Sequence, residues 1–136
     1  MKKILAAVDG STASLHAAEK ALELAQGLRA ELTLVHVASP IIMPTEVPLP
    51  PVIDLREAAL AEGAAVLRAT ERALEGATVK TLNLFGPPAE TIADAARGFD
   101  LVVVGNKGRG AVSRVLLGSV ADRLVHICRC PVLVVR

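Results

Sequence analysis

The stretch Leu101–Val120, LVVVGNKGRGAVSRVLLGSV, decides how the rest of the chain is expected to fold. Its first four residues form an apolar run typical of a strand buried on both faces of a sheet. A glycine-rich loop follows, and a last glycine stands before an apolar helical pattern. Glycines let backbone N–H groups approach a ligand closely, and a helix N-terminus offers unpaired donors and the positive end of its dipole. This stretch therefore predicts a site for an anion, and we expect a phosphate chain there. Its glycines are Gly105, Gly108, Gly110 and Gly118.

The glycine spacing distinguishes this loop from two other phosphate-binding loops. A Walker A loop ends in Gly-Lys-Ser/Thr, and the dinucleotide fingerprint is Gly-x-Gly-x-x-Gly. Here Gly108-Arg-Gly110 is followed by Ala-Val-Ser, and no Gly-Lys-Ser/Thr stands at the required place. The pattern that remains is Gly-x2-Gly-x9-Gly-Ser, from Gly105 to Ser119.

The rest of the chain alternates between strand and helix patterns. The expected strands cover residues 4–8, 32–37, 78–85, 101–104 and 131–135. Apolar residues recur at helical spacing between them, near residues 15–25, 54–74, 89–99 and 119–127. Such alternation implies right-handed crossovers and a parallel sheet, so we expect one doubly wound α/β domain over residues 1–136. The mixed faces of residues 78–85 place that strand at a sheet edge.

Local signals predict where the helices begin and end. Leu15, Ala18, Leu22 and Ala25 form the expected core face of the first helix, with Gly27 near its end. Asp54 and Glu57 have the spacing of a capping box, and Ser119 and Asp122 have the spacing of a second one. The proline-rich connection over residues 40–51 is long for an α/β loop, and such loops often act as lids or partner surfaces.

Composition excludes several classes of function. The 136 residues are 52% hydrophobic, which predicts a packed globular domain. A net charge of +1 gives no bulk field for nucleic acid, and the absence of Trp and Tyr removes the usual base-stacking platforms. No apolar run is long enough for a membrane span and no secretory leader pattern is present, so we expect a cytoplasmic protein.

Across its whole length the chain resembles the universal stress protein family. Nucleotide-binding members carry Gly-x2-Gly-x9-Gly-Ser/Thr, and the segments Ile4–Ser11 and Cys130–Val135 are similar to the ends of that family's domain. The resemblance implies a Rossmann-like domain related to the adenine nucleotide alpha hydrolases, with strand order 3-2-1-4-5. It also implies ATP binding, with Mg²⁺, and a homodimer formed through the last strand, Val132–Val135.

The resemblance further implies which residues hold the nucleotide. Asp9 would approach the ribose or a magnesium ion, the Val37 backbone would meet the adenine edge, and the Ser119 hydroxyl would donate to a phosphate. Ala7 stands where the family often has proline beside the adenine. The implied set is Ala7, Val8, Asp9, Val37, Val104, Gly105, Asn106, Gly108, Arg109, Gly110, Gly118, Ser119 and Val120.

Each implied contact has a simpler structural alternative. Asp9 has the right chemistry to cap the first helix or a turn, and the Ser119 hydroxyl to cap its own helix. A hydroxyl can accept from the backbone while donating to a ligand, so the two roles of Ser119 are compatible. Lys107 and Arg114 suit a phosphate chain and a solvated loop equally, whereas Arg109 is favoured for the phosphate chain.

The sequence His126-x-Cys128-x-Cys130 suggests a metal site, but a structural zinc takes four ligands and no fourth stands nearby. Cys-x-Cys also differs from the Cys-x-x-Cys redox motif, so we expect two reduced thiols. His36 neighbours Val37, which makes it a candidate for the border of the adenine pocket, but a packed histidine is the expected role.

Three functions remain open. The leading one is an ATP-binding regulatory protein of the stress response, because Asp9 is the only candidate for chemistry. The second is a slow Mg²⁺-dependent ATPase or phosphotransferase, which turnover would distinguish. The third is an interaction module that binds no nucleotide, which the glycine pattern argues against.

Overall fold

A computed structural model describes residues 1–39, 55–108 and 117–136. Its elements, in chain order, are β1 (Lys3–Ala7), α1 (Thr12–Leu28), β2 (Glu31–Ala38), α2 (Leu55–Ala73), β3 (Lys80–Phe85), α3 (Pro88–Ala95), β4 (Leu101–Gly105), α4 (Ser119–Ile127) and β5 (Val132–Val135). All nine expected elements are present, with boundaries that differ by a few residues. The capping prediction for Asp54 and the whole proline-rich connection over residues 40–51 lie outside the described residues.

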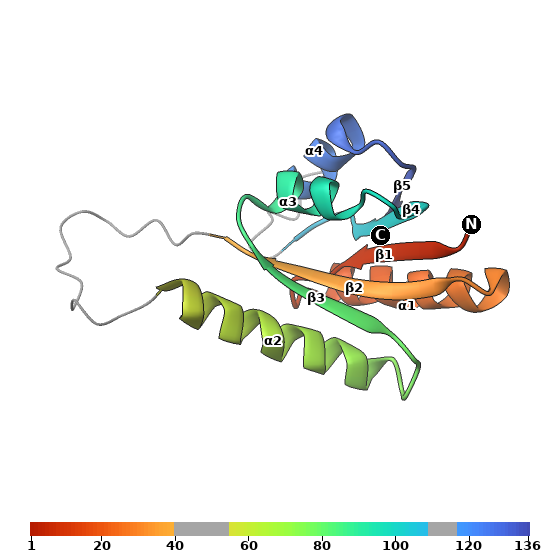
Figure 1. Cartoon of the computed structure of the whole chain (residues 1–136), viewed down its shortest axis with the longest axis horizontal. Helices are drawn as coiled ribbons and strands as arrows, with labels where there is room; N and C mark the ends of the chain where they lie inside the picture. Colours follow the sequence, from red (N-terminus) through yellow and green to blue (C-terminus); the bar gives the residue numbers. More distant parts are fainter. Residues whose placement is uncertain (40–54, 109–116) are drawn as a thin grey trace, which may run out of the picture.

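The sheet has the order β3-β2-β1-β4-β5, and all of its pairings are parallel. This confirms the predicted doubly wound fold and its strand order. β3 lies at one edge of the sheet, as its mixed faces indicated, and β5 lies at the other. In Figure 1, α1 and α2 lie on one side of the sheet and α3 and α4 on the other.

Alternate residues of the central strands build two separate cores. Ile4 and Ala6 point towards α1 and α2, whereas Leu5 and Ala7 point towards α3 and α4. This follows from the period of two in a strand, which sends successive side chains to opposite faces. Because both faces are covered, β1 and β4 are apolar throughout their centres, as the continuous apolar runs predicted.

Alanine rather than leucine forms the buried face of α1. Its buried alanines are Ala17, Ala18, Ala21 and Ala25, while Leu15 and Leu22 are only partly buried. The buried face predicted for α1 is therefore rotated about the helix axis by about one residue from the face that the structure buries. The helix also runs past Gly27, and Arg29 adopts the left-handed conformation that closes it, with φ of 56°.

Close packing between β4 and α1 depends on the absence of a side chain at Gly105. A Cβ at this position would lie 2.8 Å from both the backbone carbonyl carbon and oxygen of Ala13. Those backbone atoms belong to the first turn of α1 and have no rotamer by which to move aside. Gly105 therefore sets how closely the end of β4 approaches this helix.

None of the helices in the described ranges is long and apolar enough to cross a membrane.

We expect Gly105→Ala to lower the free energy of unfolding by about 1–3 kcal/mol, the usual range for overpacking. Gly27→Ala is the matched control, since a Cβ there meets nothing within 4 Å. Replacing a helical glycine with alanine should raise the free energy of unfolding by about 0.5 kcal/mol. Urea unfolding measures both, and a Gly105→Ala protein as stable as wild type would contradict the packing argument.

Asp100 ties the start of β4 to the start of β1. Its Oδ2 accepts from the backbone N–H groups of Lys2 at 2.7 Å and of Lys3 at 2.9 Å. These two bonds hold the pKa of the Asp100 carboxyl below its usual range. The ionised form is therefore favoured in the folded protein.

Asp100→Asn should consequently lower stability at neutral pH. Because the folded pKa is depressed, the contribution of Asp100 is complete above the unfolded pKa of about 3.9 and is lost as the pH falls below it. The difference in unfolding free energy between wild type and variant should be constant from about pH 5 to 8 and should shrink at acidic pH. Urea unfolding at a series of pH values tests this, and a gap that persists undiminished at pH 3 would count against it.

Candidate functional site

The site lies where the chain order reverses in the middle of the sheet. β1 and β4 are neighbours, with Ile4 beside Leu101 and Ala6 beside Val103. The chain leaves β1 for β2 on one side, while β4 leads to β5 on the other. Loops that follow such a strand pair diverge and leave a crevice at their carboxyl ends, where ligands of open α/β sheets bind.

The loop after β1 holds Asp9 in place through two serines. The Asp9 N–H donates to Ser14 Oγ at 3.2 Å, and Asp9 Oδ1 accepts from the Ser11 N–H at 2.9 Å. Ser11 is the N-cap of α1, because its side chain accepts from the Ser14 N–H. The expectation that Asp9 caps a turn is thus met by one carboxylate oxygen, while the helix itself is capped by Ser11.

The second carboxylate oxygen of Asp9 faces the glycine loop. A Cβ on Gly108 would lie 2.9 Å from Asp9 Oδ2, so the carboxylate occupies the space that a side chain would need. The first and fourth strands therefore bring Asp9 and the glycine loop together, as predicted from a central pairing of these strands.

The N-terminus of α4 reaches the same crevice. Gly118 donates its N–H to the carbonyl oxygen of Asn106 at 2.6 Å, which joins the end of the glycine loop to its beginning. Gly118 is the N-cap, and as a glycine it has no side chain with which to cap the helix. The predicted capping box of Ser119 with Asp122 is therefore wrong, because Ser119 is the first helical residue, one position past the cap. The first-turn N–H groups of α4 remain available to an outside acceptor.

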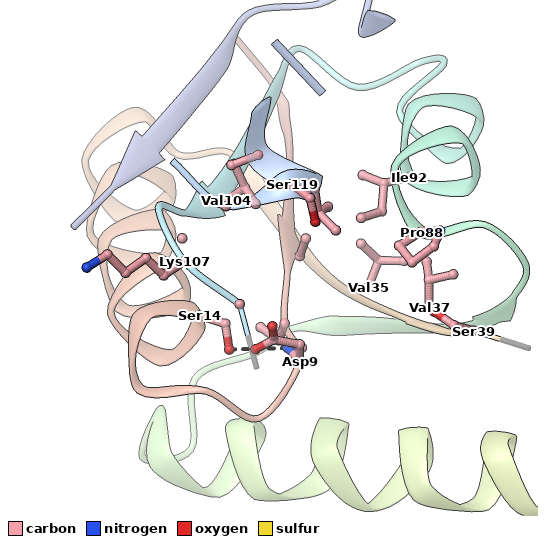
Figure 2. A pocket seen from close by; sticks show the side chains of 17 residues that line it. Asp9, Ser14, Val35, Val37, Ser39, Pro88, Ile92, Val104, Lys107 and Ser119 are labelled. Carbon is pink, nitrogen blue, oxygen red and sulfur yellow. Dashed lines mark hydrogen bonds between the residues drawn. The ribbon is translucent and has the colours of Figure 1, made fainter. Parts of the chain in front are cut away.

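A cavity of about 350 Å³ lies among these elements. Figure 2 shows apolar side chains at one end, where Val35, Val37, Pro88 and Ile92 gather. Asp9 and Ser14 lie at the other end of the cavity. The cavity thus has an apolar part between β2 and α3 and a polar part formed by the glycine loop, α4 and the loop after β1.

Most of the predicted site residues line this cavity. They are Ala7, Val8, Asp9, Val37, Val104, Gly105, Gly108, Gly118, Ser119 and Val120. Asn106 does not line it and instead contributes the carbonyl that holds Gly118. Arg109 and Gly110 lie outside the described residues, as does Arg114. Lys107 lines the cavity, but in Figure 2 its side chain extends away from Asp9 and Ser119.

Sequence reasoning missed several lining residues, namely Ser14, Val35, Ser39, Pro88, Ile92 and Ala121. Two local signals were available. Ser11 and Ser14 have the three-residue spacing of a capping pair directly after Asp9, and Pro88 begins a helix immediately after a strand. What no local pattern revealed is that α3 lies over the same end of the sheet as α4.

Two other sequence features lie away from this cavity. His36 packs beside Asn83 against Gly63 of α2, on the opposite face of the sheet from Val37, which matches the expected packed histidine. Among the described residues, no three His, Cys, Asp or Glu side chains gather as a metal site would require. A zinc site at residues 126–130, which the sequence analysis did not favour, therefore has no structural support in this part of the chain.

The sequence as a whole matches one known family. The model of the universal stress protein family matches residues 1–136. The chain belongs to the universal stress protein family. It is 40% identical to a Thermus aquaticus universal stress protein, with 99% of this chain and 98% of that protein covered. It is 34% identical to universal stress protein YxiE of Bacillus subtilis, with 98% of each covered.

The fold of this universal stress protein is also that of a solved relative. Universal stress protein UspA from Lactobacillus plantarum superposes with a TM-score of 0.81 at 29% identity. The match covers 99% of this chain and 97% of the other. The resemblance noted from the glycine spacing and the two ends of the chain is thereby confirmed at the level of family and fold.

Proposed function

We propose that this universal stress protein binds ATP, together with Mg²⁺, in the crevice between β1 and β4 and acts as a nucleotide-dependent regulator of the stress response. The observation that carries the proposal is the N-terminus of α4. Its N-cap, Gly118, offers no side-chain cap, and its first residues, Ser119 and Val120, line the same cavity as Asp9. Uncapped N–H groups beside a positive dipole end favour a phosphate group.

The apolar end of the cavity suits the adenine base. Val37, Pro88 and Ile92 offer aliphatic surfaces to the faces of a planar ring. Val37 belongs to β2, and its position near the carboxyl end of that strand brings backbone groups within reach of the base edge. The cavity of about 350 Å³ lies within the usual range of small-ligand sites, roughly 300–1,000 Å³.

The polar end suits the ribose and the phosphates. Asp9 supplies acceptors for ribose hydroxyls or for a cation, and Gly108 and Gly118 line the part of the cavity where the phosphates would lie. Asp9 is the only carboxylate among the described lining residues. Mg²⁺ fits such a site because it is commonly held by one or two carboxylates, substrate phosphates and water. Asp9 would hold the ion, which would neutralise phosphate charge.

Three structural neighbours were solved with adenine mononucleotides. They are a universal stress protein in complex with cAMP, an Arabidopsis thaliana family member with AMP bound, and an Archaeoglobus fulgidus universal stress protein with dAMP. Their identities to this chain are 24%, 22% and 17%, with TM-scores of 0.73, 0.67 and 0.68. They share the fold, and their ligands are consistent with an adenine nucleotide here.

Regulation rather than efficient catalysis is favoured by the content of the cavity. Its described lining residues include no histidine or cysteine, and Asp9 is already engaged by the Ser11 N–H. A general base needs a side chain positioned on the attacking group, and Asp9 would be occupied by ribose or cation. A slow ATPase or phosphotransferase is the alternative function.

We also propose that the protein acts in the cytoplasm.

Ser119→Asp tests the phosphate site directly. A carboxylate at the first position of α4 favours the helix through its dipole, but it places a negative charge where we expect a phosphate. We predict an ATP affinity at least about tenfold weaker, with an unchanged or raised melting temperature. Isothermal titration calorimetry with ATP, AMP and adenosine measures it, and the loss should be smallest for adenosine.

Thr12→Asp is the matched control, because Thr12 is the first residue of α1, is exposed and does not line the cavity. It adds the same charge at the same helix position and should change ATP affinity by no more than about twofold. Equal losses in the two variants, or wild-type protein that binds no ATP, would overturn the proposed site.

We further propose a homodimer formed through the free edge of β5. This edge strand is wholly apolar, and all four of its residues are only half-buried in the single chain. Pro131 and Val135 direct their carbonyl groups towards β4, accepting from Val102 and Asn106. Because a parallel ladder alternates, Val132 and Val134 direct their backbone groups to the open side. An unprotected apolar edge favours pairing with a second copy.

Val134→Pro should prevent that pairing while leaving the β4 ladder intact, because it removes an N–H that points outwards. We expect the wild type to be a dimer at micromolar concentration and the variant to be a folded monomer. Light scattering coupled to gel filtration gives the masses, and circular dichroism checks the fold. A monomeric wild type would refute the dimer.

A further inference from the structure

Cys128 and Cys130 form a close pair of thiols apart from the proposed nucleotide site. Their sulfur atoms are 3.5 Å apart and share a hydrogen bond. Both side chains are half-buried and pack against the core shared by α3 and α4. These are the only two cysteines of the chain, so each thiol has the other as its sole possible partner within the same molecule.

The backbone explains why the two thiols face each other. Cys128 follows the last turn of α4 with extended φ and ψ of −71° and 135°, and the chain then bends at Arg129 and Cys130, which brings the two sulfurs together. The ends of this short segment are anchored. The Cys128 N–H donates to the Leu124 carbonyl at 2.9 Å, and the Pro131 carbonyl accepts from the Val102 N–H at 3.0 Å. The thiols are thus held together by α4 on one side and β4 on the other.

We propose that Cys128 and Cys130 are a reversible oxidation site, at which a peroxide converts the two thiols into an intramolecular disulfide. A disulfide has an S–S distance of about 2.05 Å, so the sulfurs need to approach by about 1.5 Å from their present separation. Side-chain rotation and the bend of the chain at Arg129 and Cys130 are the means for this movement.

The reaction takes two electrons from the thiols and gives them to the peroxide. The Cys128 thiolate attacks one oxygen of hydrogen peroxide, the O–O bond breaks, and the other oxygen leaves as water after taking a proton. Cys128 is then a sulfenic acid. The Cys130 sulfur attacks the Cys128 sulfur, its proton leaves with the hydroxyl as a second water, and the S–S bond forms. An external thiol reverses the step by exchange.

The two sulfurs have different environments, which assigns their roles. Burial in apolar surroundings, and then the hydrogen bond with Cys128, raise the pKa of Cys130 to about 11. Cys130 therefore keeps its proton at neutral pH and can donate to the Cys128 sulfur. Because a protonated thiol is a poor nucleophile, we assign Cys128 as the attacking thiol and Cys130 as the resolving one.

The test counts free thiols in the folded protein before and after peroxide. Reduced protein unfolded in iodoacetamide should gain two alkyl groups, and peroxide-treated protein should gain none until dithiothreitol restores both. Trypsin cleaves after Arg123 and Arg129. Oxidised protein should therefore yield the peptide 124–129 joined by a disulfide to the peptide 130–136. Where Arg129 is not cleaved, it should yield a single 124–136 peptide that lacks two hydrogens. Met1 and Met43 can take up oxygen, but they do not change the thiol count.

The proposal would be overturned by two alkyl groups gained after peroxide, or by disulfides that link two chains on a non-reducing gel. The single variants test the roles. Cys130→Ser should form a sulfenic acid at Cys128 that dimedone traps. Cys128→Ser should be trapped far more slowly, because the burial that raises the Cys130 pKa remains. Equal rates of dimedone trapping in the two variants would overturn the assignment of Cys128 as the attacking thiol. Sulfinic acid formed in the wild type in place of the disulfide would overturn the proposed oxidation site.

Discussion

The parallel pairing of β1 with β4 is the constraint on which the rest of this molecule depends. It joins two segments nearly a hundred residues apart in the chain, and it sets Asp9 opposite the glycine loop. At the opposite end of the same pair, the backbone N–H groups of Lys2 and Lys3 donate to the Asp100 carboxylate and help to fix the register. The crevice is the consequence of this pairing, because the chain diverges from it in both directions along the sheet.

Missing side chains shape the crevice as much as those that are present. Gly105 allows the end of β4 to meet the backbone of α1, Gly108 leaves room for the Asp9 carboxylate, and Gly118 allows α4 to begin beside Asn106. Each of these glycines removes a different steric conflict at the same edge of the sheet. The glycine spacing therefore reflects three separate close contacts, in which backbone lies against backbone or against a side chain. A single tight turn does not account for the pattern.

The fold could be predicted from the sequence because its signals are local and repeated. Continuous apolar runs such as residues 101–104 mark doubly covered strands, and their alternation with helical spacing implies a parallel sheet. The site was predicted less fully, since part of it depends on how α3 lies over the sheet. Pro88 and Ile92 carry no local sign of their place beside Val37. The error at Ser119 has a related cause, since the start of α4 is shown by backbone bonds, from Gly118 to Asn106 and from Asp122 to Gly118, that the sequence does not reveal.

The alanine face of α1 limits how the sequence can vary among related proteins. Ala17, Ala18 and Ala21 are fully buried, so the backbone of this helix lies close to β1 and β4 with no space for longer side chains. Substitution by serine, glycine or cysteine keeps the volume small, whereas leucine or phenylalanine would force the helix away from the sheet. That displacement would carry the Ser11 cap and Asp9 with it. Side-chain size on the buried face of one helix is thus coupled, through the position of a turn, to the geometry of the crevice at the carboxyl ends of the strands.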